Sequence, residues 1–193
     1  MKYKLVIIGL LVLASIGMSI YLRTSHRGNL TDFSNLPKDL QGVLRPEAKP
    51  LQAFSLTDMN GQPLTPAHLK GKWTMLFFGY TYCPDICPTS LSALSTVFNQ
   101  IKTRQPDLAG NTQALFVSVD PKRDKPEILE KYISFFDKRF IAATGTKGEI
   151  DNLTRQVGAG YKLEPADESG NYVVNHTGSI FLIDSQARLL ASL

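Results

Sequence analysis

The chain has few side chains that can bind a soft metal or carry out redox chemistry: two cysteines, three histidines and four methionines among 193 residues. Met1 and Met18 lie at the N-terminal end, and Met59 and Met75 are isolated, so there is no methionine-rich metal motif. A glycine-rich loop of the kind that cradles phosphate is also absent. No cysteine lies directly after the N-terminal apolar segment, so we expect no lipoprotein processing.

The formal net charge of +4 comes from the N-terminal end of the chain. Four of the 21 basic residues lie within the first 27 positions, which contain no acid, and the other 17 balance the 17 acidic residues that follow. The rest of the chain is neutral overall and lacks the basic excess typical of nucleic-acid binding. We therefore expect no nucleic-acid partner.

Residues 5–22 form an apolar segment that is just long enough to cross the core of a bilayer. The alternative, a cleaved signal peptide, lacks a good small-x-small cleavage site, so the sequence favours an uncleaved single transmembrane helix. Paired cysteines suit an oxidising compartment, and we expect a bacterial-type inner membrane protein with its domain on the periplasmic side. The predicted organisation is an anchor at 1–27, a linker at 28–49 and one domain at 50–193.

Strand and helix patterns alternate after the linker. Asn60-Gly61 between two short segments predicts a β-hairpin, and continuous apolar runs at residues 74–80 and 114–119 predict buried strands. Apolar residues recur at helical spacing within 91–101, 128–136 and 150–157, and Thr146-x-x-Glu149 is a capping box that opens the last of these helices. Further strands are predicted at 140–144, 179–183 and 187–192. This order predicts an α/β thioredoxin-like fold with an N-terminal β-hairpin, preceded by the single transmembrane helix.

The two cysteines, Cys83 and Cys87, lie between the strand at 74–80 and the next helix. A helix N-terminus favours the thiolate, because its free N–H groups and its dipole stabilise negative charge. Residues four apart in a regular helix have Cβ atoms about 5–6 Å apart, whereas a disulfide needs about 3.8 Å. The spacing favours a shared metal, permits a disulfide if the turn distorts the helix, and leaves two inert buried thiols as the third interpretation.

A metal would need a further ligand, and the histidines are the candidates. His26 lies beside the membrane segment, and His68 lies in a short helical turn that we expect to be exposed. His176 precedes a predicted buried strand, and its loop is either a ligand-bearing loop at the cysteine end of the sheet or an ordinary surface turn. Two thiolates and one imidazole suit Cu(I), or Cu(II) with an added oxygen ligand, better than a four-ligand structural zinc.

Two acidic residues between the second buried strand and the following helix, Asp120 and Asp124, are interpreted as loop and helix-cap residues. Asp124 lies two residues before Pro126 and three before Glu127, which is typical of a helix N-terminus. We therefore expect structural roles for both carboxylates.

Three segments, in this order along the chain, resemble the Sco/SenC family: Phe77-Phe78-Gly79-Tyr80-Thr81-Tyr82-Cys83-Pro84-Asp85-Ile86-Cys87-Pro88, then Val117-Ser118-Val119-Asp120-Pro121 with Arg123-Asp124 and Pro126-Glu127, and Asn175-His176-Thr177-Gly178-Ser179-Ile180-Phe181-Leu182-Ile183-Asp184. The resemblance covers residues 51–190. It implies a membrane-anchored, thioredoxin-fold copper chaperone of cytochrome c oxidase assembly. By this resemblance, Cys83, Cys87 and His176 are the copper ligands, and Cys83 and Cys87 also form a redox-active disulfide.

The resemblance further implies a metallochaperone rather than an enzyme, which passes copper to the dinuclear copper centre of the oxidase. Its expected partners are the copper-receiving subunit of cytochrome c oxidase and a periplasmic thiol reductant. The alternative function is a thiol–disulfide oxidoreductase or redox sensor, which uses Cys83 and Cys87 but does not need His176. A peroxide-reducing thiol enzyme is less well matched, because Thr81 precedes Cys83 by two residues rather than three.

One sheet face is expected to be poorly covered. Members of the family usually continue into a C-terminal helix over that face, and here Leu189 and Leu190 are followed by only a few residues. The strand at 187–192 is therefore expected to be poorly protected from solvent, unless residues such as 38–56 cover it.

Overall fold

The protein is described by a computed structural model over residues 37–193, and the chain divides into two units, Met1–Gln41 and Gly42–Leu193. The described part of the first unit contains the one-turn helix α2 (Lys38–Gln41). The apolar segment at 5–22, and with it the predicted anchor at 1–27, lies outside the described residues. Within residues 37–193, no helix is both long and apolar enough to cross a membrane.

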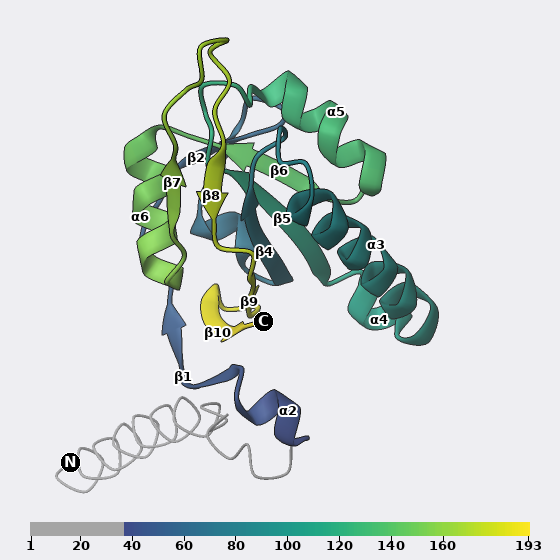
Figure 1. Ribbon diagram of the computed structural model, residues 1–193. Coiled ribbons are helices and arrows are strands. Elements are labelled where there is room, and N and C mark those ends of the chain that lie inside the picture. Colours follow the sequence, from purple (N-terminus) through teal and green to yellow (C-terminus); the bar gives the residue numbers. More distant parts are fainter. Residues whose placement is uncertain (1–36) are drawn as a thin grey trace, which may run out of the picture. The chain divides into compact units, whose positions relative to one another are not determined.

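Eight strands of the second unit form one mixed sheet in the order β1-β10-β9-β4-β5-β6-β2-β3 (Figure 1). The centre is parallel, since β4 (Trp73–Gly79) pairs with β5 (Thr112–Ser118) and β5 pairs with β6 (Ile141–Thr144). All other neighbours pair antiparallel, and these strands are β1 (Leu44–Pro50), β2 (Leu56–Asp58), β3 (Pro63–Leu64), β9 (Ile180–Ile183) and β10 (Arg188–Ser192).

Helices cover both faces of the central strands. Figure 1 shows α3 (Ile86–Arg104) and α5 (Pro126–Phe136) on one side of the sheet and α6 (Lys147–Val157) on the other. Because β4 and β5 are buried on both faces, their sequences are continuous apolar runs rather than alternating ones, and Phe77 and Val117 are completely buried. Two shorter helices, η1 (Pro66–Leu69) and α4 (Pro106–Ala109), lie in the connections before β4 and before β5.

The order of strands and helices predicted from the sequence is confirmed. The Asn60-Gly61 turn joins β2 to β3, with Gly61 at a positive φ of 76° that glycine adopts without strain. Thr146 caps α6 as predicted, because its side chain accepts a hydrogen bond from the Glu149 N–H. Local turn and cap chemistry was therefore a sound guide to these elements.

Residues 44–49, predicted as part of the linker, form most of β1. This strand pairs with β10, with Leu44 opposite Ala191 and Pro50 opposite Arg188. Its two prolines weakened the strand signal, but proline is tolerated in an edge strand such as this one. With β1 on one side and β9 on the other, β10 is an interior strand, and Leu189 and Leu190 are buried. The expectation that these leucines lack cover is therefore wrong, and the stated alternative, cover by residues within 38–56, is confirmed.

A separate two-stranded sheet, also not predicted, carries the candidate histidine. It consists of β7 (Tyr161–Leu163) and β8 (Val174–His176), which pair antiparallel with Tyr161 opposite His176. A loop at residues 164–173 joins them and turns at Gly170, where φ is 81°. Strands of three residues have too little periodicity to be recognised in a sequence.

Candidate metal centre

The cysteines lie on the turn that leads from β4 into α3. β4 ends at Gly79, and the Cys83 N–H then donates a hydrogen bond of 3.1 Å to the Tyr80 carbonyl. Because α3 begins at Ile86, Cys87 is its second residue. Cys87 is completely buried, whereas Cys83 is 9% exposed. Both cysteines are therefore buried, and Cys83 keeps a small exposed fraction.

A glycine is needed at the end of β4 because the Cys87 sulfur occupies the space above it. A Cβ atom at Gly79 would lie 2.6 Å from the Cys87 Sγ atom and 2.7 Å from the ring of Phe116. Both distances are shorter than any normal contact, so the missing side chain lets the sulfur pack directly on the strand backbone.

The sheet topology brings His176 to the same edge as the cysteines. β9 runs antiparallel to β4 with Ile180 opposite Phe77, so the start of β9 lies beside the end of β4. His176 ends β8, four residues before β9 begins, and its ring packs edge-on against the rings of Phe77 and Tyr80 with centroids 6.1 and 5.9 Å away. Of the two places that the sequence left open for this loop, the structure shows the one at the cysteine end of the sheet.

The three side chains meet closely enough to share one ion. The His176 Nε2 atom lies 3.3 Å from the Cys87 Sγ atom, and one ligand atom from each of Cys83, Cys87 and His176 lies within 4.8 Å of the others. The two thiols are not bonded to each other. The His176 Nδ1 lies 3.1 Å from the Thr177 carbonyl oxygen. That oxygen can only accept, so Nδ1 carries the proton and the Nε2 lone pair faces the sulfurs.

Burial sets the protonation of these groups. It raises the pKa of the Cys87 thiol well above the ordinary value, and this effect outweighs the backbone hydrogen bond at Tyr80 that lowers it. The expected helix-stabilised thiolate is therefore wrong for Cys87, because loss of hydration outweighs the helix N-terminus. Burial also lowers the pKa of His176, which favours the neutral imidazole that a metal requires.

This donor set suits a soft, low-coordinate ion. Two sulfurs and one imidazole nitrogen match Cu(I), whereas a structural zinc site has four protein ligands. Among the described residues, His68 lies elsewhere, with its Nδ1 atom 3.1 Å from the Thr65 hydroxyl. His26, the remaining histidine, lies outside the described residues.

Comparisons with known proteins identify the family of the chain. The profile of the SCO1/SenC family matches residues 44–193. The chain belongs to the SCO1/SenC family. A human relative, named Protein SCO1 homolog, mitochondrial, is 36% identical over 139 residues, which are 71% of this chain and 45% of the human protein. The chain thus spans less than half the length of that relative.

Solved SCO1/SenC structures share the fold. The structure of Bradyrhizobium japonicum ScoI with copper bound is 38% identical, has a TM-score of 0.68, and covers 75% of this chain and 88% of its own. Copper-bound yeast Sco1 is 30% identical, also with a TM-score of 0.68, over 75% of this chain and 79% of its own. The α/β thioredoxin-like fold predicted from the sequence is therefore confirmed.

The side chain of Asn175, next to His176, points away from the site. Its Nδ2 atom donates a hydrogen bond of 2.8 Å to Glu164, on the loop that follows β7. The carbonyl of Thr177 therefore orients the imidazole, and Asn175 instead ties the two sides of the hairpin together.

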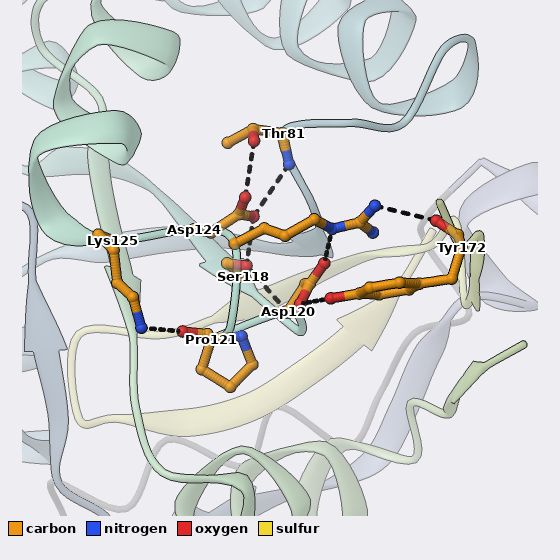
Figure 2. A network of polar contacts seen from close by, with 8 residues as sticks. Thr81, Ser118, Asp120, Pro121, Asp124, Lys125 and Tyr172 are labelled. Atoms are coloured by element: carbon orange, nitrogen blue, oxygen red, sulfur yellow. Dashed lines mark hydrogen bonds and ion pairs between the residues drawn. The ribbon is translucent and has the colours of Figure 1, made fainter. Parts of the chain in front are cut away.

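Sequence reasoning missed the part that Asp120 and Asp124 play beside this site. Asp124 does not cap α5, whose N-cap residue is Lys125. Both carboxylates are completely buried, and they bind the cysteine turn and the loop before β8 through Thr81 and Tyr172 (Figure 2). The only signal in the sequence was their place in a motif of the SCO1/SenC family, because burial of a loop carboxylate has no local pattern.

Proposed function

We propose that this protein binds copper between Cys83, Cys87 and His176 and passes it to the dinuclear copper centre of cytochrome c oxidase during assembly of the oxidase. The observation that carries the proposal is the convergence of two sulfurs and one imidazole nitrogen within 4.8 Å. Copper-bound structures of two relatives support the choice of metal. The protein is then a metallochaperone, with copper as its cargo.

The residues of the site have different tasks in this function. Copper binds the thiolate form, so the buried Cys87 thiol gives up its proton as copper binds and binding releases acid. The carbonyl of Thr177 keeps the His176 proton on Nδ1 and leaves Nε2 free to bind. Cys87 is buried, while Cys83 and His176 are nearer the surface. A receiving protein therefore meets Cys83 and His176 first, and a site of three ligands leaves room for the incoming ligand during transfer.

The second candidate function is thiol–disulfide exchange by Cys83 and Cys87. It is favoured by the two free thiols lying within 4.8 Å of each other, with Cys83 the more exposed of the two cysteines. In an oxidising compartment such a pair tends to close to a disulfide, so copper loading would need a thiol reductant. The two functions share both cysteines and differ in their need for His176.

The deciding experiment replaces His176 by Ala and compares it with Cys83→Ser and with His68→Ala, a histidine outside the site. The purified domains are tested for bound copper and for the redox couple of the cysteines, and cells are tested for oxidase activity. The proposal expects His176→Ala to lose copper and oxidase activity while the cysteines still cycle, and His68→Ala to behave as the unmodified protein. Full oxidase activity and normal copper content in His176→Ala would favour thiol exchange instead.

We also infer the membrane arrangement, from the sequence. Residues 1–27 are proposed to anchor the protein in a bacterial-type inner membrane as a single pass, and the linker then leads to β1 at Leu44. The domain is placed on the periplasmic side, where it meets the copper-receiving subunit and a thiol reductant. Reporter enzymes fused after Leu193 test this. We expect a fused reporter that works only in the periplasm to be active. Activity of a reporter that works only in the cytoplasm would contradict this arrangement.

A further inference from the structure

A largely buried polar network joins Thr81, Ser118, Asp120, Asp124 and Tyr172 (Figure 2). Its centre is the loop between β5 and α5, at residues 119–125, and it has two halves joined by Ser118. The Ser118 hydroxyl donates a hydrogen bond of 2.5 Å to Asp124 and accepts one of 3.0 Å from the Asp120 N–H. Each half of the network holds one of the two segments that supply the proposed ligands.

The first half fixes the cysteine turn. Thr81, two residues before Cys83, donates to the Asp124 carboxylate from its N–H at 2.9 Å and from its hydroxyl at 2.6 Å. With the Ser118 hydroxyl, Asp124 thus accepts three hydrogen bonds. A completely buried carboxylate is stable only when it is satisfied in this way, so the turn is held at a defined place.

The second half holds the hairpin that carries His176. The Tyr172 hydroxyl donates to the Asp120 carboxylate at 2.8 Å. Arg123 forms an ion pair with the same carboxylate through Nε, and its Nη1 donates to the Tyr172 carbonyl at 3.0 Å. Hydrogen bonds therefore hold both the side chain and the main chain of Tyr172, two residues before β8 begins.

The guanidinium of Arg123 also joins the two segments by stacking. Its central carbon lies 3.7 Å from the centre of the Tyr172 ring, on the hairpin side, and 4.8 Å from that of the Tyr82 ring, beside Cys83. A planar guanidinium can stack and form directed hydrogen bonds at once, which a lysine ammonium cannot. Arg123 thus contacts one tyrosine in each of the two segments that carry the proposed ligands, although it belongs to neither segment.

The hairpin needs such a support. β7 and β8 have three residues each and form a sheet of their own, and a two-stranded hairpin alone is only marginally stable in water. Besides the Arg123 and Tyr172 contacts, the end of β8 is tied by Thr177, whose N–H donates to the Gly160 carbonyl at 2.9 Å. Thr177 holds the chain after His176, Val174 packs into the core before it, and Tyr172 adds a second point of attachment further up the hairpin.

We propose that Arg123 and Tyr172 are positioning residues that hold the His176 hairpin against the cysteine turn and thereby set the copper affinity of the site. The inference rests on the proposed copper function and adds residues that do not touch the metal. Loss of their contacts lets His176 move away from the sulfurs. Supporting residues outside the ligand set typically change metal affinity by about 10- to 100-fold.

The test compares Tyr172→Ala, Tyr172→Phe and Arg123→Lys with the control Lys125→Ala in the full chain. Lys125 lies in the same loop, and its Nζ donates to the Pro121 carbonyl at 2.8 Å (Figure 2). Three quantities are measured: Cu(I) affinity by competition with a chromophoric chelator, the midpoint potential of the cysteine pair, and amide exchange of β8 in the metal-free protein.

Tyr172→Ala is expected to lower Cu(I) affinity by about 10- to 100-fold, to speed exchange in β8, and to leave the midpoint potential unchanged because both sulfurs stay in place. Arg123→Lys should act in the same direction, and Tyr172→Phe, which keeps the ring, should recover most of the affinity. Lys125→Ala should match the unmodified protein in all three quantities.

Unaltered β8 exchange in Tyr172→Ala would overturn the proposal, and so would faster exchange with unaltered copper affinity. A fall in affinity that merely follows a rise in the unfolded fraction, seen in a shifted potential and general loss of protection, would also count against it. Failure of the unmodified protein to bind Cu(I) would instead contradict the proposed function, and the exchange comparison would still decide whether Tyr172 holds the hairpin.

Discussion

The Nε2 atom of His176 lies 3.3 Å from the sulfur of Cys87, although 89 positions separate the two residues. The contact exists because β9 runs antiparallel to β4, which puts the chain before β9 next to the turn after β4. Cys87 packs against the bare backbone of Gly79, and the carbonyl of Thr177 orients the ring of His176.

Gly79→Ala should displace Cys87. The added methyl group would lie 2.6 Å from the Cys87 sulfur and 2.7 Å from the Phe116 ring, and β4 is held on both sides by neighbouring strands. Overpacking of this kind typically costs about 1–3 kcal/mol. We expect a loss of that size in the free energy of unfolding, measured with urea, together with weaker copper binding.

The matched control for this substitution is Gly110→Ala. Gly110 has φ −66°, and a Cβ atom there would meet only the Asp107 carbonyl oxygen at 4.0 Å. The control should keep its stability and its copper. Equal stability of Gly79→Ala and Gly110→Ala would show that Cys87 can move at little cost.

Asp124 should make the protein less stable as the pH rises. Burial raises the pKa of this carboxyl, and the hydrogen bonds from Ser118 and Thr81 only partly oppose that effect. A carboxyl with a raised pKa in the folded state contributes its full stability below its unfolded pKa, about 3.9. That contribution is lost as the pH rises through the folded value. The stability of the unmodified protein relative to Asp124→Asn should therefore fall between pH 4 and neutrality.

Asp137→Asn should show the opposite pH dependence of stability in the same measurement. Hydrogen bonding from Arg139 lowers the pKa of Asp137, so its contribution is present above the unfolded pKa and is lost as the pH falls through the folded value. Urea unfolding of the three proteins at a series of pH values gives both comparisons. If the stability of the unmodified protein relative to Asp124→Asn instead increases with pH, the hydrogen bonds to Asp124 affect its pKa more than its burial does.

The strand β10 should be well protected from hydrogen exchange. It pairs with β1 on one side and β9 on the other, and Leu189 is completely buried. Interior strands open only with much of the fold, whereas edge strands exchange locally. Amides of β10 should exchange about as slowly as those of β5 and far more slowly than that of Leu64, in the edge strand β3. Exchange in β10 as fast as at Leu64 would show that β1 does not stay paired.

The sequence by itself determined the elements whose signals are local. The apolar run of β4, the Asn60-Gly61 turn and the Thr146 cap were all recognisable, because each depends on residues a few positions apart. The order of these elements was enough to predict the α/β thioredoxin-like fold. The cysteine spacing indicated a site at the turn into α3, and the resemblance to the family added His176 as the expected third ligand.

The tertiary structure alone decided what depends on burial and on distant pairing. β1 is a strand because β10 accepts it, and its own residues, with two prolines, give no such signal. The pKa of Cys87 is raised because the folded chain removes water from the sulfur, which outweighs the local effect of the helix N-terminus. Asp124 resembled a helix cap in the sequence, yet it binds Thr81, 43 positions away, because folding buries its carboxylate beside the cysteine turn and leaves it no solvent to bind.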